Sequence, residues 1–294
     1  MTVAAAASVR EALHATARRL RACGSRSPRL DAELLLAMAL GVDRVTLVTE
    51  SERVLTPVEE RRFERYVRRR EAHEPIAYIR GRRAFRTLEL EVTPAVLIPR
   101  PETETLVEVA LEALAAVPAE HGEPLALDVG TGAGCIALAL AAEDPFVSVT
   151  AVDVSEAAVE QARLNAGRLG LAGRLHLLQS DLFAALPPEA RFDVIVSNPP
   201  YIPAAEYDQL EPNVREYEPR LALYGGDDGL DVYRRLVPEA LGRLRTGGML
   251  AVEVGAGEAA AVRELFAAAG GYAPPLERGD LDGIPRVVWA AKAA

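Results

Sequence analysis

The sequence predicts a doubly wound α/β domain that follows a small helical domain, and three observations carry this prediction. After residue 124, short apolar segments alternate with amphipathic ones, which is typical of a sheet with helices on both faces. A glycine-rich turn follows the first of these apolar segments. Residues 1–80 show helical patterns and a different charge balance. We therefore expect a helical domain over 1–80 and an α/β domain over 81–294.

Helix-starting signals support the helical prediction for the N-terminal region. Ser27 and Pro28 provide a cap and a first-turn proline before an apolar run that ends at Gly41. Thr56 and Glu59 form a capping box around a proline, which opens a strongly charged helix through about residue 71. The arginines of this helix form either an ordinary solvated face or a patch that faces RNA or a partner protein. They are Arg61, Arg62, Arg65, Arg68, Arg69 and Arg70.

The pattern changes to β alternation near residue 85. Leu88, Leu90 and Val92 alternate with polar residues, and a proline-rich stretch over 94–101 follows. We expect a β-hairpin here that connects the two domains, followed by a helix over about 102–116. The strands expected beyond it are 125–129, 147–152, 175–179, 194–197, 249–254 and 286–290. The helices expected there are about 135–142, 155–167, 229–244 and 258–269.

Composition and charge exclude several classes of protein. The 33 basic and 43 acidic residues give a net charge of −10, a poor match for a duplex nucleic acid. Residues 1–86 carry 18 basic and 11 acidic side chains (+7), which leaves 15 and 32 (−17) for residues 87–294. No apolar run approaches the roughly 20 residues that span a bilayer, and Cys23 and Cys135 lack metal or redox spacing. We expect a cytoplasmic protein with free thiols, no metal, and neither DNA nor a membrane as partner.

The first strand of the α/β domain runs into a glycine-rich turn that opens a helix. After Asp128 and one valine, the turn consists of Gly130, Thr131, Gly132, Ala133 and Gly134. This spacing differs from the G-x-G-x-x-G of dinucleotide sites and is similar to the D-x-G-x-G-x-G loop of S-adenosylmethionine-dependent methyltransferases. Glycine lets the backbone turn tightly and lie against a ligand. We therefore expect S-adenosylmethionine as the cofactor.

Further positions are expected to bind the same cofactor. Asp153 ends the next strand, 23 residues after the first glycine of the loop, where a carboxylate accepts ribose hydroxyls. Ser155 is a better-placed cap for the following helix, which leaves Asp153 free for that role. The third strand leads to Asp181 and Leu182, where such enzymes contact the adenine. Asn198, after the fourth strand, is expected to contact the cofactor as well.

Asn198, Pro199, Pro200 and Tyr201 close the fourth strand at the sheet edge where ligands bind. The proline rings stiffen this turn and remove N–H donors, so that it presents carbonyl groups. The Asn198 side-chain oxygen and the Pro199 carbonyl can accept both hydrogens of a substrate –NH2, and Tyr201 offers a flat face to a planar group. The motif predicts methyl transfer to a carboxamide or an exocyclic amine, catalysed mainly by positioning.

Together these motifs resemble the bacterial release factor glutamine methyltransferases (PrmC, also called HemK) over nearly the full length. The segment 74–81 matches the family's interdomain segment, and 97–104 matches its most distinctive motif. The other matching segments follow in the family order: the glycine loop, Asp153, 179–181, 198–202, 218–220 and 226–229. The resemblance implies a class I, Rossmann-like methyltransferase whose N-terminal domain docks the substrate. The implied substrate is the Gly-Gly-Gln glutamine of class-1 peptide-chain release factors, which act in translation termination. The glutamine is methylated on its side-chain amide nitrogen (N5).

By the same resemblance, the loop 130–134 and Asp153 bind the cofactor, and residues 198–201 bind the glutamine. Some members have tryptophan where this chain has Leu182, so we expect packing there without aromatic stacking. The enzyme is expected to be a monomer. No obvious general base is present, and none is required, because a newly methylated amide nitrogen is strongly acidic and can lose its proton to water.

Three alternative functions remain at this level. A glutamine methyltransferase of a ribosomal protein would share the same chemistry. An adenine-N6 DNA methyltransferase could use the same Asn-Pro-Pro-Tyr turn, although the charge of −17 over residues 87–294 disfavours DNA. A non-enzymatic, cofactor-binding regulator would not require the acceptor turn that Asn198 and Pro199 provide.

Overall fold

The computed structural model describes residues 7–118, 120, 122–280 and 282–293. The chain forms two compact units. The first comprises Met1–Gly81 and Glu211–Tyr217, and the second comprises Arg82–Leu210 and Glu218–Ala294. A short segment from late in the chain therefore belongs to the first unit. Within the described residues, no helix has the length and apolar character needed to cross a bilayer.

The first unit is mainly helical in its described part, with one isolated β-bridge between Ser8 and Val54. Its helices are α1 (Val9–Ala22), α2 (Pro28–Leu40), α3 (Arg44–Thr49), α4 (Pro57–Glu71), α5 (Ile76–Arg80) and α10 (Pro212–Arg215). The capping box expected at the start of α4 is present, since the Thr56 hydroxyl accepts from the Glu59 N–H and the Glu59 carboxylate accepts from the Thr56 N–H. Apolar side chains of α1, α2 and α4 form a common core, and Leu20, Leu35 and Val67 are completely buried. This packing stabilises helices that would be marginal in isolation.

The start of α2 differs from the expectation. Ser27 occupies the N-cap position and Pro28 the first turn, as expected, but the Ser27 side chain makes no capping hydrogen bond. Its hydroxyl instead donates to Asp31 (3.1 Å), a buried carboxylate that also accepts from Ser25 (2.8 Å) and from Arg70 on α4 (2.9 Å). A buried carboxylate requires such partners, and this requirement outweighs the helix cap.

Most arginines of α4 interact within the first unit. Arg62 donates to the Ala39 carbonyl (3.1 Å), and three others form ion pairs with carboxylates. These pairs are Arg68 with Glu64, Arg69 with Glu74, and Arg70 with Asp31. Four of the six arginines are therefore held by neighbours in the same unit, which agrees better with a solvated helix face than with a patch reserved for a partner. A contact with RNA or a partner stays a prediction.

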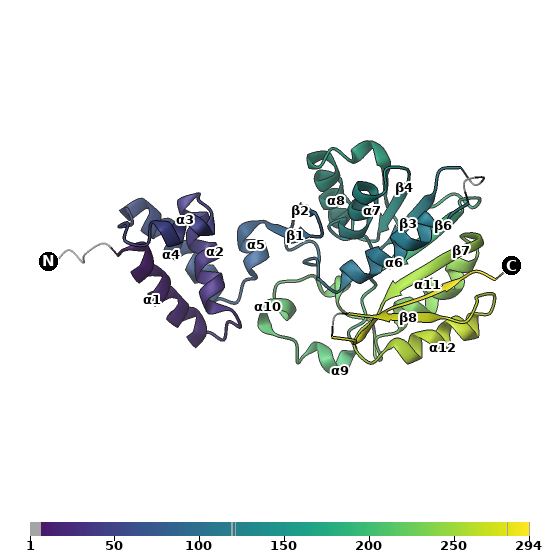
Figure 1. Ribbon diagram of the computed structural model, residues 1–294. Helices are drawn as coiled ribbons and strands as arrows, with labels where there is room; N and C mark the ends of the chain where they lie inside the picture. Colours follow the sequence, from purple (N-terminus) through teal and green to yellow (C-terminus); the bar gives the residue numbers. More distant parts are fainter. Residues whose placement is uncertain (1–6, 119, 121, 281, 294) are drawn as a thin grey trace. The chain divides into compact units, whose positions relative to one another are not determined.

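The second unit contains a hairpin and a seven-stranded sheet (Figure 1). The hairpin pairs β1 (Arg82–Phe85) with β2 (Leu88–Glu91). The sheet has the order β5-β4-β3-β6-β7-β9-β8. Its first five strands are parallel, and β9 runs antiparallel to both of its neighbours, β7 and β8. Its strands are β3 (Leu125–Val129), β4 (Ser148–Asp153), β5 (Leu175–Gln179), β6 (Phe192–Ser197), β7 (Leu244–Glu253), β8 (Leu276–Gly279) and β9 (Pro285–Ala291).

Two strands of this sheet depart from the expectation. β8 was missed because its residues are exposed or half-buried, so no apolar alternation marks it. β7 was expected from residue 249, but it begins at Leu244 and includes two glycines that interrupt the apolar pattern. The other expected strands are present within two residues of their bounds.

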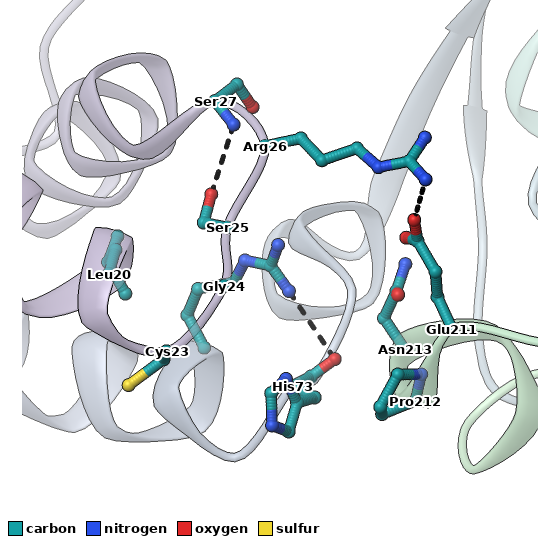
Figure 2. A pocket seen from close by; sticks show the side chains of 11 residues that line it. Leu20, Cys23, Gly24, Ser25, Arg26, Ser27, His73, Glu211, Pro212 and Asn213 are labelled. Atoms are coloured by element: carbon teal, nitrogen blue, oxygen red, sulfur yellow. Dashed lines mark hydrogen bonds and ion pairs between the residues drawn. The ribbon is translucent and has the colours of Figure 1, made fainter.

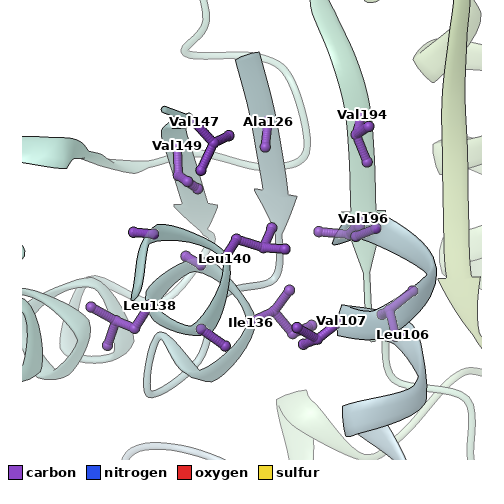
Figure 3. Close-up of a cluster of buried hydrophobic side chains, with 14 of the residues drawn as sticks. Leu106, Val107, Ala126, Ile136, Leu138, Leu140, Val147, Val149, Val194 and Val196 are labelled. Carbon is purple, nitrogen blue, oxygen red and sulfur yellow. The ribbon is translucent and has the colours of Figure 1, made fainter. Parts of the chain in front are cut away.

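Helices cover both faces of the sheet. They are α6 (Thr103–Ala115), α7 (Cys135–Glu143), α8 (Glu156–Arg168), α11 (Asp231–Leu241) and α12 (Ala259–Ala269). The short helix α9 (Ala204–Tyr207) lies in the connection between β6 and β7. Ser155 caps α8 as expected, since its hydroxyl accepts from the Ala158 N–H. Alternate strand residues point to opposite faces: Val194 and Val196 pack with α6 and α7 (Figure 3), whereas Ile195 packs with α11 and α12. The doubly wound architecture is therefore confirmed.

Candidate active site

The predicted site residues lie at the carboxyl edge of the parallel strands. β3 and β6 are neighbours, with Val129 paired to Ser197, so the glycine loop and the Asn-Pro-Pro-Tyr turn leave the sheet side by side. β3 is also where the strand order reverses, since β4 lies on one side of it and β6 on the other. Open α/β sheets bind ligands at such a switch point. The Ser197 hydroxyl donates to the Val129 carbonyl (2.7 Å) and thereby ties the two strand ends together.

The glycine loop requires its glycines. Gly130, Gly132 and Gly134 have φ values of +79°, +55° and +83°, which side chains rarely adopt. A Cβ at Gly134 would also lie 2.9 Å from Leu138 Cδ1 and 3.2 Å from Ala162 Cβ. Gly130 is exposed, so its backbone is accessible to a ligand.

The intervening loop residues face inward and fix the loop. Thr131 and Ala133 are buried. The Thr131 hydroxyl donates to Asp128 Oδ2 (2.7 Å), and the Ala133 carbonyl accepts from Asn165 on α8 (2.9 Å). These two residues therefore act as supports, while the exposed Gly130 and the half-buried Gly132 supply the accessible backbone.

Two carboxyl groups hold this loop from beneath. Asp153 Oδ2 accepts from the Gly132 N–H and Oδ1 from the Ser155 N–H, both at 2.9 Å. Burial raises the pKa of Asp153, and these hydrogen bonds offset part of that effect. Asp128 is completely buried, and burial raises its pKa to about 7. Its Oδ1 has no hydrogen-bond partner among the described residues, which makes the ionised form of this carboxyl group costly.

The third strand places its predicted residues differently. Asp181 is exposed, and its carboxylate pairs with Arg235 of α11 (3.0 Å), so the side chain has a partner other than a ligand. Leu182 has a φ of +48° and is buried beside Phe183 in the core cluster of α11 and α12. The Ser180 N–H donates to the Asp153 carbonyl (2.8 Å), so this loop does lie next to the expected ribose position.

The Asn198 side chain is held by an interaction that the sequence did not indicate. Its Nδ2 donates to the hydroxyl of Thr103, the first residue of α6, at 3.1 Å. Within the described part of the chain, no donor reaches Asn198 Oδ1. The side chain is half-buried, so this free acceptor is available to a substrate.

The rest of the turn is packed closely. A Cβ at Gly229 would lie 2.3 Å from the Tyr201 carbonyl oxygen, and one at Gly225 would lie 2.8 Å from the Pro200 carbonyl oxygen. Glycines at 225 and 229 are therefore required, because the segment that contains them passes directly against the backbone of Pro200 and Tyr201. Tyr201 is half-buried, and burial raises the pKa of its phenol above its ordinary range, so it stays neutral at physiological pH.

The distinctive 97–104 segment is fixed beside this turn by a buried carboxylate. Glu218 accepts from the Ile98 N–H (3.0 Å) and pairs with Arg100. Only 1% of the Glu218 side chain is exposed, against 31% for Arg100, so the charge pair is buried at one end only. Glu218 thus joins two segments that match the family motifs, 97–104 and 218–220. Thr103 belongs to the first of these segments and meets Asn198.

Sequence reasoning missed several polar residues of this edge. Thr103, Glu218 and Glu253 are buried and surround the turn, and Glu258 accepts from the Gly255 N–H. Burial raises the pKa of both Glu253 and Glu258 to about 7. One signal was available for Glu253, because an acidic residue that ends an apolar strand lies at the same edge as the ligand sites.

A separate hollow in the first unit is not part of this site (Figure 2). It has a volume of about 330 Å3 and is lined by residues that include Arg26, Arg70, His73 and Glu211. Arg26 pairs with Glu211, and Arg70 donates to the His73 carbonyl. The hollow contains none of the residues predicted to bind cofactor or glutamine.

The fold and the site define an enzyme of the methyltransferase class. Residues 11–81 match the family described as PrmC N-terminal domain, and residues 106–211 match the one described as Methyltransferase small domain. Among solved structures, the hMettl16 catalytic domain in complex with a MAT2A 3′UTR hairpin has a TM-score of 0.56 at 16% identity, over 70% of this chain and 76% of that chain. At this identity the likeness shows the fold alone, which is the class I methyltransferase fold.

Curated relatives then identify the family. The Release factor glutamine methyltransferase of Bradyrhizobium diazoefficiens is 44% identical over 97% of this chain and 95% of its own length. That of Moorella thermoacetica is 47% identical over 90% of this chain and 92% of its own length. This chain belongs to the release factor glutamine methyltransferase family. The resemblance expected from the motifs is confirmed.

Proposed function

We infer that this enzyme transfers the methyl group of S-adenosylmethionine to the side-chain amide nitrogen of the Gly-Gly-Gln glutamine in class-1 release factors. One structural observation carries the proposal. Asn198, with its free acceptor, follows β6, and the glycine loop follows the neighbouring strand β3. A substrate amide held by Asn198 and a cofactor held by the glycine loop are therefore neighbours. The family relatives support release factors, and they give no support to a ribosomal protein or to DNA as the substrate.

The residues at the glycine loop fit the proposed cofactor. Exposed glycine backbone offers room for the methionine part, and Asp153 retains lone pairs beyond its two backbone hydrogen bonds for ribose hydroxyls. Asp128 is completely buried, and its negative charge, when it is ionised, favours a positively charged group bound nearby. When bound, S-adenosylmethionine supplies an electrophilic methyl group on a cationic sulfur. Asp181 and Leu182 are proposed to border the adenine, through the backbone and the Leu182 side chain, because the Asp181 carboxylate is paired with Arg235.

The turn residues orient the amide. Asn198 Oδ1 and the Pro199 carbonyl each accept one N–H of the glutamine amide, which fixes the plane of the group and aims its nitrogen at the methyl donor. Pro200 stiffens the turn, and the neutral Tyr201 ring packs against the planar amide. The methylated nitrogen then loses one proton to water. The enzyme's contribution is mainly to position the reacting atoms.

The first unit is proposed to dock the release factor. The first unit carries 16 basic and 13 acidic side chains (+3), whereas the second unit carries 17 and 30 (−13), so the two units offer different surfaces to a protein partner. We propose that the enzyme acts as a monomer in the cytoplasm, where translation termination takes place.

One incubation tests the function. The full chain is mixed with methyl-labelled S-adenosylmethionine and, separately, with a release factor, the same factor with its Gly-Gly-Gln glutamine replaced by glutamate, ribosomal proteins, and duplex DNA. We expect label only in the intact factor, at the glutamine found by mass mapping. Label in ribosomal protein or DNA, or label retained by the replaced factor, would contradict the proposal.

A further inference from the structure

Glu253 is a buried carboxylate for which the proposed reaction so far has no use. It ends β7 and is 1% exposed. Its Oε2 has no hydrogen-bond partner among the described residues. Its backbone carbonyl accepts from the Tyr233 hydroxyl (2.6 Å), which fixes the strand end. Because an unpartnered buried carboxylate is costly, its presence at the ligand edge requires an explanation.

The Thr103 hydroxyl connects Glu253 to the substrate turn. It accepts from Asn198 Nδ2 at 3.1 Å, and it is also the neighbouring hydroxyl that lowers the pKa of the Glu253 carboxylate. Thr103 is itself 1% exposed, so water does not compete for it. The three side chains, which come from β7, α6 and the turn after β6, thus follow one another: Glu253 and Thr103 are buried, and Asn198 is half-buried.

The direction of this chain follows from the charge on Glu253. An ionised carboxylate can only accept, so the Thr103 O–H must donate to it. The Thr103 oxygen then accepts from Asn198, and the amide is held with Nδ2 toward Thr103 and Oδ1 free. If Glu253 is protonated, it can donate to the Thr103 oxygen, and the Thr103 hydrogen becomes available to the Asn198 carbonyl oxygen. The amide would then turn over and lose its free acceptor.

We propose that Glu253 is a positioning residue, which in its carboxylate form and through Thr103 keeps the Asn198 carbonyl turned toward the substrate amide. This inference rests on the proposed function, since it assigns a purpose to the Asn198 acceptor. The orientation of the Asn198 amide would then depend on the protonation state of Glu253, and therefore on pH.

The surroundings of Glu253 place this switch near neutrality. Burial raises its pKa to about 7, against the lowering effect of Thr103. The charged and titratable groups that act on it come from all the elements packed around it. They are Glu102, Arg100, Arg286, Tyr201, Cys135 and Tyr233.

The first test measures methyl transfer in the full chain at saturating cofactor. Thr103→Val removes the hydroxyl while preserving the shape, and Thr103→Ser retains it as a matched control. We expect Thr103→Val to lower kcat about tenfold with cofactor affinity unchanged, and Thr103→Ser to restore most of it. Equal kcat in Thr103→Val and the wild type would overturn the proposal.

The second test is the pH profile between pH 6 and pH 8. With a pKa near 7, only about a tenth of Glu253 is ionised at pH 6, so wild-type kcat is expected to fall about tenfold from pH 8. Glu253→Gln is expected to be slower than wild type at pH 8 and to lose this dependence. In the Thr103→Val background, Glu253→Gln is expected to have no further effect, which is the coupling that a double-mutant cycle detects. An unchanged acid fall in Glu253→Gln would refute the assignment.

A third readout does not depend on catalysis. The side-chain 1H–15N signals of Asn198, assigned by their loss in Asn198→Asp, are followed by NMR in the full chain. We expect them to shift with a midpoint near pH 7 in the wild type and in Thr103→Ser, but not in Glu253→Gln or Thr103→Val. If the wild type methylates no release factor yet shows this pattern, the proposed function fails and the switch stands. If it methylates the factor and the signals do not titrate, the switch fails alone.

Discussion

Replacing Glu253 by glutamine should stabilise the second unit at alkaline pH, while the same change impairs the site. The pKa of Glu253 is raised by burial from its ordinary value of 4.5 to about 7. The folded state therefore holds the proton more tightly than the unfolded chain does. The stability that follows from this is fully present below pH 4.5 and is lost as the pH rises through 7. Glutamine carries no charge at any pH, so it avoids this loss.

The size of the effect follows from the two pKa values. Between these two pKa values, each rise of one pH unit lowers the free energy of unfolding by about 1.4 kcal/mol. Between pH 5 and pH 8, the wild type should lose about 2.5 kcal/mol relative to Glu253→Gln. Asp128 and Glu258, whose pKa values are also raised to about 7, titrate in both proteins and cancel in the difference.

The chain contains a suitable probe for this measurement. Its single tryptophan, Trp289, lies on β9 opposite Ala251 of β7, so its fluorescence reports unfolding of the second unit. Denaturant unfolding is measured at pH 5, 6, 7 and 8 for wild type, for Glu253→Gln and for Glu264→Gln, an exposed control on α12. A stability difference between wild type and Glu253→Gln that stays constant with pH would show that Glu253 is ionised without penalty and would refute this reasoning.

Four further results are expected. Asn198→Ala removes the free acceptor and should lower kcat on the order of 10²–10³, with cofactor affinity changed much less; retention of more than about a tenth of wild-type kcat would restrict Asn198 to shaping the turn. Asp153→Ala should weaken cofactor binding at least about tenfold by calorimetry, since one side chain supports the loop and accepts ribose hydroxyls, whereas unchanged affinity would remove it from the site. Binding of the cationic cofactor should release protons at pH 6–7, because a positive charge favours the ionised form of Asp128. Calorimetry in buffers of different ionisation enthalpy measures the number of protons released, and proton uptake on binding would contradict this prediction. A chain starting at Gly81 should bind cofactor but methylate intact release factor poorly, and full activity would exclude the docking role.

Local signals explain why much of the site could be predicted. Gly130, Gly132 and Gly134 need their positive φ values within one turn, and the prolines after Asn198 stiffen that turn by themselves. Each of these motifs follows an apolar strand, so its place at the sheet edge follows from topology alone. The side-chain roles of Asp153 and Asn198 stay predictions that the geometry supports.

Contacts between distant segments explain what was missed. Thr103 and Glu253 are separated by 150 positions, and they meet because β7 pairs with β6 and α6 begins beside the turn. No spacing along the chain encodes this meeting. The segment Glu211–Tyr217 was likewise assigned to the α/β domain, yet it packs in the first unit, where the Tyr217 hydroxyl donates to the Ala72 carbonyl.

The carboxyl edge of the sheet has a common electrostatic design. The strands β3, β4 and β7 each carry an acidic residue at or near this end, and burial raises the pKa of all three: Asp128, Asp153 and Glu253. Two of them have an oxygen without a partner among the described residues. Such groups destabilise the folded chain when ionised, so a stable fold alone does not account for them. A cationic methyl donor near Asp128 and Asp153 would recover that energy on binding. Glu253 lies beyond the proposed cofactor contacts, and its charge is explained instead by the direction it imposes on the Asn198 amide.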